Sequence, residues 1–396
     1  MEKRKIWKMP TIAALFGLAL TLILTGFLPA RIGTTTDWVS VSTGAMHTIA
    51  IRSDGSLWAW GNNEDGQIGD GTTSDRLSLI QIGTARSWAS VSAGAFHTVA
   101  IRRDGSLWTW GSNGWGQLGD GSGGYGWEDS SRDRHTPVQI GMARNWADVS
   151  TGAFYTVAIK RDGSLWAWGG NEYGQLGDGT TENRLAPVQI GYDTNWAAVS
   201  AGDGHTVAIR TDGSLWAWGR NSTGQLGDGT TENRLAPVQI GRQSNWASVS
   251  AGNAHTVATR EDGSLWAWGC NEQGQLGNGV SGCGNEYQSP VRIGRVANWA
   301  SVSAGAFHSV AIRTDGSLWA WGANWDGRIG DGTVNHRGVP VRIGTASNWV
   351  SASAGDGHTV SVKADGSLWA WGHNGWGQLG NGMRSNHHAP IQVVTP

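Results

Sequence analysis

The chain has 396 residues and a formal net charge of −2 at pH 7, from 29 Lys and Arg against 31 Asp and Glu. This near-neutral balance gives no electrostatic case for nucleic-acid binding, which depends on a basic surface. The 62 glycines and 26 tryptophans far exceed the usual content of a globular protein, and they indicate a glycine-rich repeat.

The first 28 residues differ from the rest of the chain. A basic head, Glu2-Lys3-Arg4-Lys5 with Lys8, precedes an uncharged apolar run of 18 residues from Thr11 to Leu28. This pattern predicts a signal peptide or a signal anchor over residues 1–28, and it disfavours a buried helix. The run is at the lower limit for a membrane-spanning helix, so cleavage and anchoring both stay open. We expect an extracytoplasmic protein that is secreted or anchored by this segment, with residues 29–37 as a linker.

A repeated hairpin pattern begins after the linker. In the fourth copy, His205–Arg210 alternates as a strand does, Asp212-Gly213 predicts a two-residue type I′ turn, and Ser214–Trp218 returns as the second strand. The hairpin with its Asp-Gly pair occurs seven times, with the pair beginning at Asp54, Asp104, Asp162, Asp212, Asp262, Asp315 and Asp365. A period of this length is typical of a solenoid, a propeller or an array.

Each copy contains four strand candidates. In the fourth copy these are Trp196–Ser200, His205–Arg210, Ser214–Trp218 and Pro237–Ile240, with proline at the first residue of the last strand. Repeated four-stranded antiparallel units without helices predict an all-β fold, a seven-bladed β-propeller over 38–396 that follows an N-terminal hydrophobic signal or anchor helix. The predicted repeats are 38–87, 88–145, 146–195, 196–245, 246–298, 299–348 and 349–396.

The two ends of the chain both contain a segment that resembles an outer strand. Residues 390–394 include three β-branched residues, whereas residues 29–33 include only Ile32 and adjoin the apolar segment. We therefore expect residues 390–394 to complete the last blade and residues 29–33 to be a linker.

Three motifs carry a family resemblance. They are Ala-Gly-x-x-His-Thr-Val-Ala, Asp-Gly-Ser-Leu-Trp-Ala-Trp-Gly and Asn-x-x-Gly-Gln-Leu-Gly-Asp-Gly. Over residues 29–396 the chain resembles the regulator of chromosome condensation repeat family, and we expect it to be an exported, bacterial member. The resemblance implies a seven-bladed propeller, and for the founding member of the family it implies guanine-nucleotide exchange on a small GTPase.

One repeat position holds a histidine in six copies and a tyrosine in the third. The residues are His47, His97, Tyr155, His205, His255, His308 and His358. A ring of histidines suggests a metal site, but each copy belongs to a different blade, and neighbouring copies are then too far apart to share one ion. We therefore predict a structural hydrogen-bonding role.

A second repeat position is basic. The residues are Arg52, Arg102, Lys160, Arg210, Arg260, Arg313 and Lys363. An aspartate follows each one two residues later, so a solvated, locally neutralised rim is favoured over an anion site.

The Gly174–Gly179 segment lacks the Gly-Lys-Ser/Thr ending of a phosphate loop and predicts a turn. With no catalytic constellation outside the repeat pattern, we expect no enzyme activity, no cofactor and no metal.

The two cysteines, Cys270 and Cys283, lie in the long loop of the fifth copy. In an oxidising compartment they could form a disulfide, and two free thiols are the alternative.

In an antiparallel meander, the turn before each histidine and the long loop before each fourth strand lie at one end of the blade, here called the loop face. Aromatic residues and one methionine gather there in copies six, seven, one, two and three, and binding sites are often on loops held by a rigid scaffold. The candidate binding residues are Met46, Phe96, Trp115, Tyr125, Trp127, Phe154, Tyr173, Phe307, Trp325 and Trp376. We predict a protein partner here, with a carbohydrate and a small GTPase as alternatives.

Overall fold

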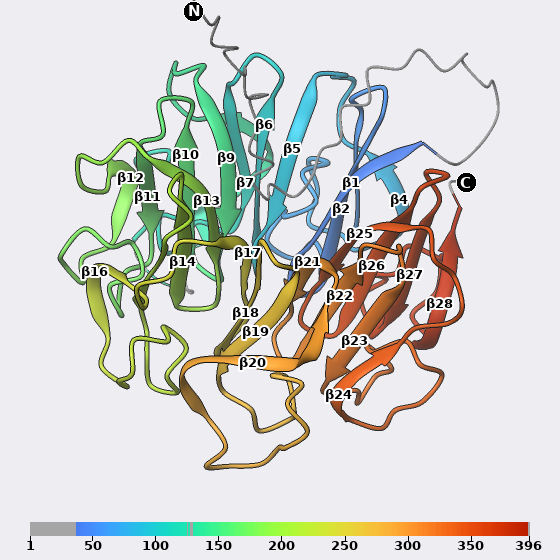
Figure 1. Cartoon of the computed structure of the whole chain (residues 1–396). Helices are drawn as coiled ribbons and strands as arrows, with labels where there is room; N and C mark the ends of the chain where they lie inside the picture. The colour runs from blue at the N-terminus through green and yellow to red at the C-terminus, as the bar shows by residue number, and fades with distance from the viewer. Residues whose placement is uncertain (1–36, 125, 127–129, 395–396) are drawn as a thin grey trace, which may run out of the picture.

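The computed structural model describes residues 37–124, 126 and 130–394. Within this part of the chain, seven four-stranded sheets surround a central axis, and the first blade lies beside the last (Figure 1). Each blade is antiparallel, and its strands follow one another in chain order from the inside to the outside. The predicted seven-bladed propeller of four-stranded antiparallel blades is therefore confirmed.

The strands fall into four sets by their place in the blade. The inner strands are β1 (Trp38–Thr43), β5 (Trp88–Ala93), β9 (Trp146–Thr151), β13 (Trp196–Ala201), β17 (Trp246–Ala251), β21 (Trp299–Ala304) and β25 (Trp349–Ala354). The second strands are β2 (His47–Arg52), β6 (His97–Arg102), β10 (Tyr155–Lys160), β14 (His205–Arg210), β18 (His255–Arg260), β22 (His308–Arg313) and β26 (His358–Lys363).

The other two sets complete each blade. The third strands are β3 (Leu57–Gly61), β7 (Leu107–Gly111), β11 (Leu165–Gly169), β15 (Leu215–Gly219), β19 (Ser264–Gly269), β23 (Leu318–Gly322) and β27 (Leu368–Gly372). The outer strands are β4 (Arg76–Gln81), β8 (Arg134–Gln139), β12 (Arg184–Gln189), β16 (Arg234–Gln239), β20 (Tyr287–Ala297), β24 (Arg337–Arg342) and β28 (His387–Val393). A short 3-10 helix, η1 (Ser130–Arg132), lies in the long loop of blade 2.

The hairpin between the second and third strands is present, but its turn differs from the predicted type I′. The backbone N–H of Gly55 donates to the carbonyl of Arg52, and Arg52 N–H donates to Ser56. The loop thus has three residues, and only Gly55 has a positive φ, of 80°. Asp54 keeps a negative φ because its carboxylate accepts the Ser56 N–H at 2.8 Å, so one left-handed residue is enough.

The outer strands begin earlier than the sequence predicts. β16 starts at Arg234, so Pro237 is its fourth residue and not its first. Pairing with the third strand shifts between Gly219↔Arg234 and Ala217↔Val238, and Pro237 lies within that irregular stretch. Because the strand is at the edge of its blade and irregular there, the missing proline N–H breaks no ladder hydrogen bond.

The ring closes between blade 7 and blade 1 without exchange of strands. β28 pairs with β27, which confirms that the C-terminal segment completes the last blade. A serine in each inner strand accepts a backbone N–H from the next inner strand, and Ser353 accepts the Thr43 N–H at 3.1 Å to close the circle. The other six pairs are Ser42–Ala93, Ser92–Thr151, Ser150–Ala201, Ser200–Ala251, Ser250–Ala304 and Ser303–Ala354.

The hydrophobic core lies between blades and not within a single centre. The cluster at the closing interface joins Trp38 and Trp60 of blade 1 to Val360 and Leu368 of blade 7. Each of the other six clusters joins two neighbouring blades in the same way. Neighbouring blades thus cover both faces of every sheet. This is needed because neither face of the repeated hairpin is polar enough to be exposed to water.

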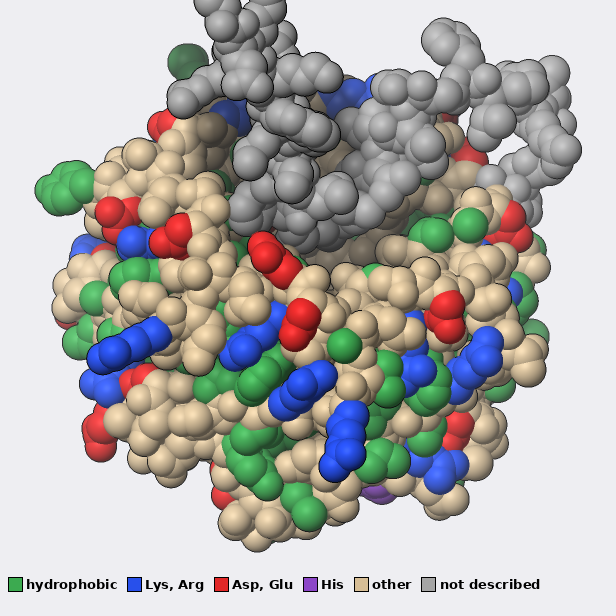
Figure 2. Space-filling view, in the orientation of Figure 1, with side chains coloured by type: hydrophobic (Ala, Val, Ile, Leu, Met, Phe, Trp, Pro, Cys, Tyr) green, Lys and Arg blue, Asp and Glu red, His purple; other side chains and the backbone are tan. Residues whose placement is uncertain are grey.

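The predicted signal or anchor helix and the linker up to residue 36 lie outside the described residues. Among the described residues, no helix is long and apolar enough to cross a membrane. Figure 2 shows acidic and basic side chains interspersed over the visible side of the propeller, consistent with the small net charge.

Candidate functional site

The repeated histidines lie buried where neighbouring blades meet. The Nε2 of His47 is 3.1 Å from the Thr98 hydroxyl, which itself donates to the Gln67 carbonyl at 2.9 Å. Because the threonine proton is used on the carbonyl, His47 Nε2–H must be the donor. Burial lowers the pKa of His47 to about 3. In blade 3, Tyr155 instead donates to the His205 carbonyl at 2.6 Å.

These contacts form a second closed ring around the propeller, in which His358 Nε2 is 3.0 Å from Thr48. The others are His97–Thr156, His205–Thr256, His255–Ser309 and His308–Thr359. The histidine positions thus have the predicted structural role. Among the described residues, no group of three or more His, Cys, Asp or Glu side chains is arranged to hold a metal ion.

The basic ring does not form the solvated rim that the sequence suggests. The guanidinium of Arg102 lies between two indoles, 3.8 Å from the Trp108 centroid and 4.6 Å from Trp88. The carboxylate of Asp104 accepts the N–H and hydroxyl of Ser106, at 3.0 and 2.6 Å. The tryptophans are therefore the direct partners of these cations, because a guanidinium or ammonium is attracted to an indole face.

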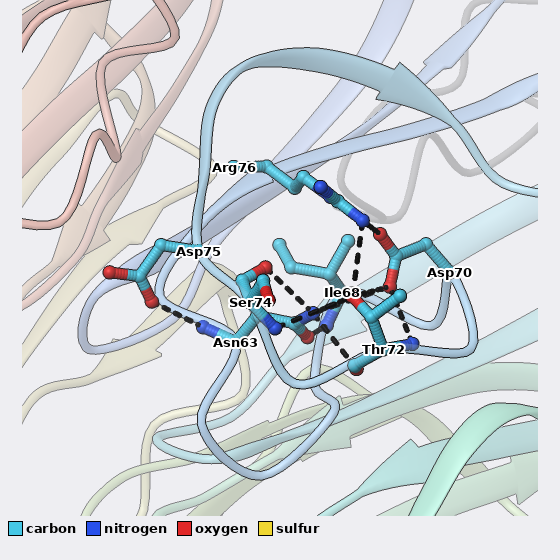
Figure 3. Close-up of polar contacts among 7 residues, drawn as sticks. All are labelled: Asn63, Ile68, Asp70, Thr72, Ser74, Asp75 and Arg76. Atoms are coloured by element: carbon cyan, nitrogen blue, oxygen red, sulfur yellow. Dashed lines mark hydrogen bonds and ion pairs between the residues drawn. The ribbon is translucent and has the colours of Figure 1, made fainter.

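The long loops are organised by a buried asparagine (Figure 3). Asn63 Nδ2 donates to Asp70 Oδ1 at 3.3 Å, and its Oδ1 accepts the Ile68 N–H at 3.0 Å. The Asp70 carboxylate also forms an ion pair with Arg76. The Gly174–Gly179 segment has the same arrangement, so its glycines serve a turn whose polar groups are satisfied internally.

The loop face varies from blade to blade. Two residues separate the glycine and the histidine of each Ala-Gly-x-x-His turn, and the first of them lines a cavity of about 130 Å³ at the mouth of the central channel. This first residue is alanine in blades 1, 2, 3 and 6: Ala45, Ala95, Ala153 and Ala306. In blades 4, 5 and 7 it is Asp203, Asn253 and Asp356. We call these three residues the polar mouth.

The second residue of the turn varies in step with the first. It is Met46, Phe96, Phe154 or Phe307 where the first is alanine, and Gly204, Ala254 or Gly357 where the first is polar. A large apolar side chain and a polar mouth residue therefore exclude each other within a blade. The large apolar residues at the second position were predicted from the sequence, but the polar residues at the first were not. Their departure from the alanine of the other blades could have revealed them.

The two aspartates of the polar mouth interact electrostatically. Desolvation raises the pKa of Asp356 to about 6, and the Asp203 carboxylate adds to this shift, whereas Arg328 opposes it. Burial also raises the pKa of Asp203, whereas Arg220, 3.9 Å away, lowers it. Each of these two carboxylates is harder to ionise than an aspartate in water, so a positively charged group at this opening would be stabilised by them.

Arg328 supports the mouth from below and was also missed. Six copies have glutamine at its position, and Arg328 is 6 % exposed. It donates to the Asp356 carbonyl at 2.7 Å and to the Asp326 carboxylate at 2.6 Å. Its guanidinium also lies 5.0 Å from the centroid of Trp325.

Among the described residues of the loop face, two sets of the predicted aromatic side chains are in ring contact. Phe96 and Phe154 stack at 5.8 Å, with Trp115 at 6.3 Å from Phe154. Phe307 contacts Trp325 edge-on at 5.9 Å. The half-buried candidates are Met46, Phe96, Trp115, Phe154, Tyr173, Phe307 and Trp376, and Trp325 is 49 % exposed. Tyr125 and Trp127 lie outside the described residues.

Both cysteines are free thiols in this structure. Cys270 is buried and Cys283 is exposed, with its sulfur 3.9 Å from the Glu272 carboxylate. Burial raises the pKa of the Cys270 thiol. The predicted disulfide is therefore not formed here, and its formation in oxidised protein stays a prediction.

Comparison with known proteins shows the family. The RCC1-like domain model matches residues 189–396, more than half of the chain. The regulator of chromosome condensation repeat matches residues 54–101, 104–159 and 162–209, and a second model of that repeat matches 38–67, 88–117 and 146–175. The chain belongs to the regulator of chromosome condensation repeat family.

Two curated relatives match part of the chain. The Arabidopsis thaliana ultraviolet-B receptor UVR8 is 32% identical over 152 residues, which are 36% of this chain and 32% of the receptor. The X-linked retinitis pigmentosa GTPase regulator homolog of Caenorhabditis elegans is 29% identical over 145 residues, 37% of this chain and 6% of that protein. The chain thus spans about a third or less of the length of these relatives.

One solved structure extends the likeness of fold. Prp20p of Saccharomyces cerevisiae, described with its binding to Gsp1p and histones, matches with a TM-score of 0.76 and 21% identity. The match covers 88% of this chain and 87% of Prp20p. At this identity the comparison shows a shared fold.

Proposed function

We propose that this protein is a non-catalytic, extracytoplasmic scaffold that binds a protein partner through its loop face. The observation that carries the proposal is the unequal loop face, where blades 4, 5 and 7 supply the polar mouth and blades 1, 2, 3 and 6 supply large apolar side chains. The hairpins and the contacts between blades recur around the ring, so this variation lies on a surface held by a rigid frame.

The chemistry of this face suits a protein surface. The Phe96–Trp115–Phe154 cluster and the exposed Trp325 supply aromatic anchors on either side of the mouth. Interfaces between proteins are enriched in such anchors next to polar groups. The description of Prp20p as binding Gsp1p and histones supports protein binding as a use of this fold.

Extracytoplasmic location rests on the basic head and the apolar run before residue 29. A reporter enzyme fused after Pro396 tests this part of the proposal. Reporter activity on the outer side of the membrane is expected, and activity only in the cytoplasm would contradict it.

The loop-face proposal is tested by crosslinking in the native host, followed by mass spectrometry. The double variant Asp203→Ala/Asp356→Ala places the residue of blades 1, 2, 3 and 6 at both positions, so the fold should be kept. We expect a partner that crosslinks to the wild type to be lost from this variant and from Phe96→Ala/Phe154→Ala. Equal crosslinking by all three proteins would contradict the proposal.

A second candidate is regulation of a small GTPase. The matched relative named as a GTPase regulator homolog supports it, as does the description of Prp20p. This function requires a cytoplasmic propeller, so the reporter fusion separates the two candidates. Saturable binding on a glycan array that is lost in Trp115→Ala and Trp376→Ala would instead favour the carbohydrate alternative.

A further inference from the structure

A cavity of about 330 Å³ lies between blades 3 and 4, at the end of the propeller opposite the loop face. This end carries the Asp-Gly turns and the links between blades, and we call it the turn face. The cavity is lined by inner strand β9, by β10 and the turn after it, by the link before β13 and by the turn after β14. None of these segments belongs to the loop face.

Asp148 of β9 lines this cavity and carries a charge at a position where no other blade has one. The equivalent residue is Ser40, Ser90, Ser248, Ser301 or Ser351 in five blades and Ala198 in blade 4. Asp148 is half-buried and accepts the Val149 N–H at 2.9 Å. Among the described residues, no lysine or arginine forms an ion pair with Asp148.

Two cationic residues, Lys160 and Arg161, also line the cavity, but each has other contacts. Lys160 lies 3.5 Å from the Trp166 centroid and 4.7 Å from Trp146. Arg161 extends toward blade 2, where its Nη2 lies 3.2 Å from the position that a Cβ on Gly105 would take. The remaining two charged residues, Asp162 and Asp193, have partners of their own.

Those two are acidic. The Asp162 carboxylate accepts the N–H and hydroxyl of Ser164 at 3.0 and 2.6 Å. Asp193, in the link, is paired with Arg210 at 2.5 Å. Asp148 is therefore left as a carboxylate without a cation in a desolvating cavity, and burial raises its pKa to about 6.

The cavity walls are largely apolar. Ile159 and Trp196 are 4 % exposed and belong to the core between blades 3 and 4, and Ala147 and Ala197 line the cavity beside them. A space of this size with apolar walls and one unpaired carboxylate is complementary to an alkyl chain that ends in a positive charge.

Two large exposed apolar side chains lie on the links before and after blade 3, on the same turn face as the cavity. Met142 is 95 % exposed and Tyr192 is 97 % exposed, and each directly follows the glycine of its link, before and after blade 3. The equivalent residues of the other links are Thr84, Arg242, Arg295 and Thr345. Two such side chains on the links that flank one blade are typical of a surface that contacts another protein.

We propose that this cavity receives a lysine or arginine side chain of a protein partner, with the cation at Asp148 and the alkyl chain against Ile159 and Trp196. Met142 and Tyr192 then contact the partner surface around that side chain. This contact is on the opposite face from the proposed loop-face site and does not depend on it. Binding a cation stabilises the ionised carboxylate, so it requires Asp148 to be deprotonated.

The test uses the full-length chain in detergent and three capped pentapeptides, Gly-Gly-X-Gly-Gly with lysine, arginine or norleucine as X. The δ1-methyl resonance of Ile159 reports binding by NMR. We expect saturable shifts with the lysine and arginine peptides and none with norleucine. We also expect a lysine-peptide affinity about twofold weaker at pH 6 than at pH 7.5, with circular dichroism at both pH values checking that the chain stays folded.

The matched variant is Asp148→Ser, which inserts the residue of five other blades. Asp148→Asn is a second variant that keeps the shape of the side chain. Both should abolish the shifts, and persistence in either, or equal shifts with norleucine, would overturn the proposal. The double variant Asp203→Ala/Asp356→Ala should leave these shifts unchanged, so failure here is distinct from failure of the loop-face proposal.

A free amine is distinguished from a partner side chain by two further measurements. Met142→Thr and Tyr192→Thr insert the residue found at Thr84 and Thr345, and they should weaken longer lysine peptides while leaving n-butylamine unaffected. If n-butylamine binds as tightly as those peptides in the wild type, the site takes a free amine and the protein-partner assignment is overturned.

Discussion

The interfaces between blades and the loop face obey opposite rules within the same repeat. At the interfaces, the histidine, threonine, serine and tryptophan contacts recur around the ring, and even Tyr155 keeps a hydrogen bond to the next blade. On the loop face, neighbouring blades change from alanine to aspartate and from phenylalanine to glycine. Residues that repeat therefore build the propeller, and residues that depart from the repeat indicate where it makes specific contacts.

The same rule applies on the turn face. Asp148 replaces a serine or an alanine, and Met142 and Tyr192 replace threonine or arginine. No stability argument requires these departures, since six other blades fold without them. The difference between repeated interfaces and variable faces can be tested by substitutions at the interfaces and by substitutions on the faces.

The largest expected effect is acid unfolding through the interface histidines. Burial lowers the pKa of five of them to about 3, and that of His308 well below its ordinary value. An unfolded histidine titrates near 6.5, so the unfolded chain binds more protons below that pH and stability falls as the pH falls. Linkage gives a loss of about 2 kcal/mol per histidine at pH 5. Circular dichroism should show cooperative unfolding as the pH falls from about 6.5 toward 3, the range between the unfolded and folded pKa values.

Blade 3 offers a control for this prediction. Tyr155→His adds a seventh titrating histidine at the same place, so the acid midpoint should move to higher pH. An unchanged midpoint, or a wild type that stays folded below pH 3.5, would show that the interfaces tolerate protonated histidine.

The next largest effect is expected at the glycine of each Ala-Gly-x-x-His turn, where neighbouring blades approach closely. A Cβ on Gly252 would lie 2.4 Å from the Gly305 carbonyl of the next blade and 2.6 Å from its own blade's His255 ring. Gly252→Ala should therefore destabilise the propeller by about 3 kcal/mol, since neither the backbone nor the packed ring can yield. The control is Gly204→Ala on the loop face, where blade 5 has Ala254, with an expected change within about 1 kcal/mol. Urea unfolding compares the two, and equal losses would contradict the distinction between interface and face.

The smallest effect is a stabilising one at the polar mouth. The folded pKa of Asp356 is raised to about 6, so its ionisation at higher pH costs folded-state stability that the unfolded chain does not lose. Asp356→Ala should raise the melting temperature at pH 7.5 and raise it less at pH 5.5. Asp212→Ala, which removes the acceptor for Ser214 on the turn face, should lower the melting temperature. If Asp356→Ala lowers it instead, the mouth contributes to stability and its departure from alanine needs no binding role.

Much of the architecture was predictable because the same local pattern occurs in all seven copies and each copy can be compared with the others. Alternation and the Asp-Gly pairs were enough for seven blades, and three β-branched residues were enough to assign the last outer strand. The turn type was predicted wrongly because the Asp54 side chain, by accepting a local N–H, removes the need for a second left-handed residue. The position of Pro237 was wrong because pairing of an edge strand shifts around it.

The candidate sites were less predictable because a site depends on which side chains converge. Asp203 and Asp356 are 153 residues apart by number, and only ring closure brings them to one mouth. Arg328 resembles an exposed loop arginine until its carbonyl partner at Asp356 is known. Asp148 looks like one polar residue in a polar inner strand, and only the gap beside blade 4 makes it the charged wall of a cavity.

The sequence by itself determined the number of blades, the order of strands and the residues that recur at each interface, because local alternation and glycine positions are written in every copy. The tertiary structure alone decided what those recurring polar groups bind, which departures meet at one opening, and where the cations lie. The physical reason is distance. Each hydrogen bond of the rings joins residues about one repeat apart or at opposite ends of the chain, such as His47 with Thr98 and Thr43 with Ser353, and their partners exist only once the circle has closed.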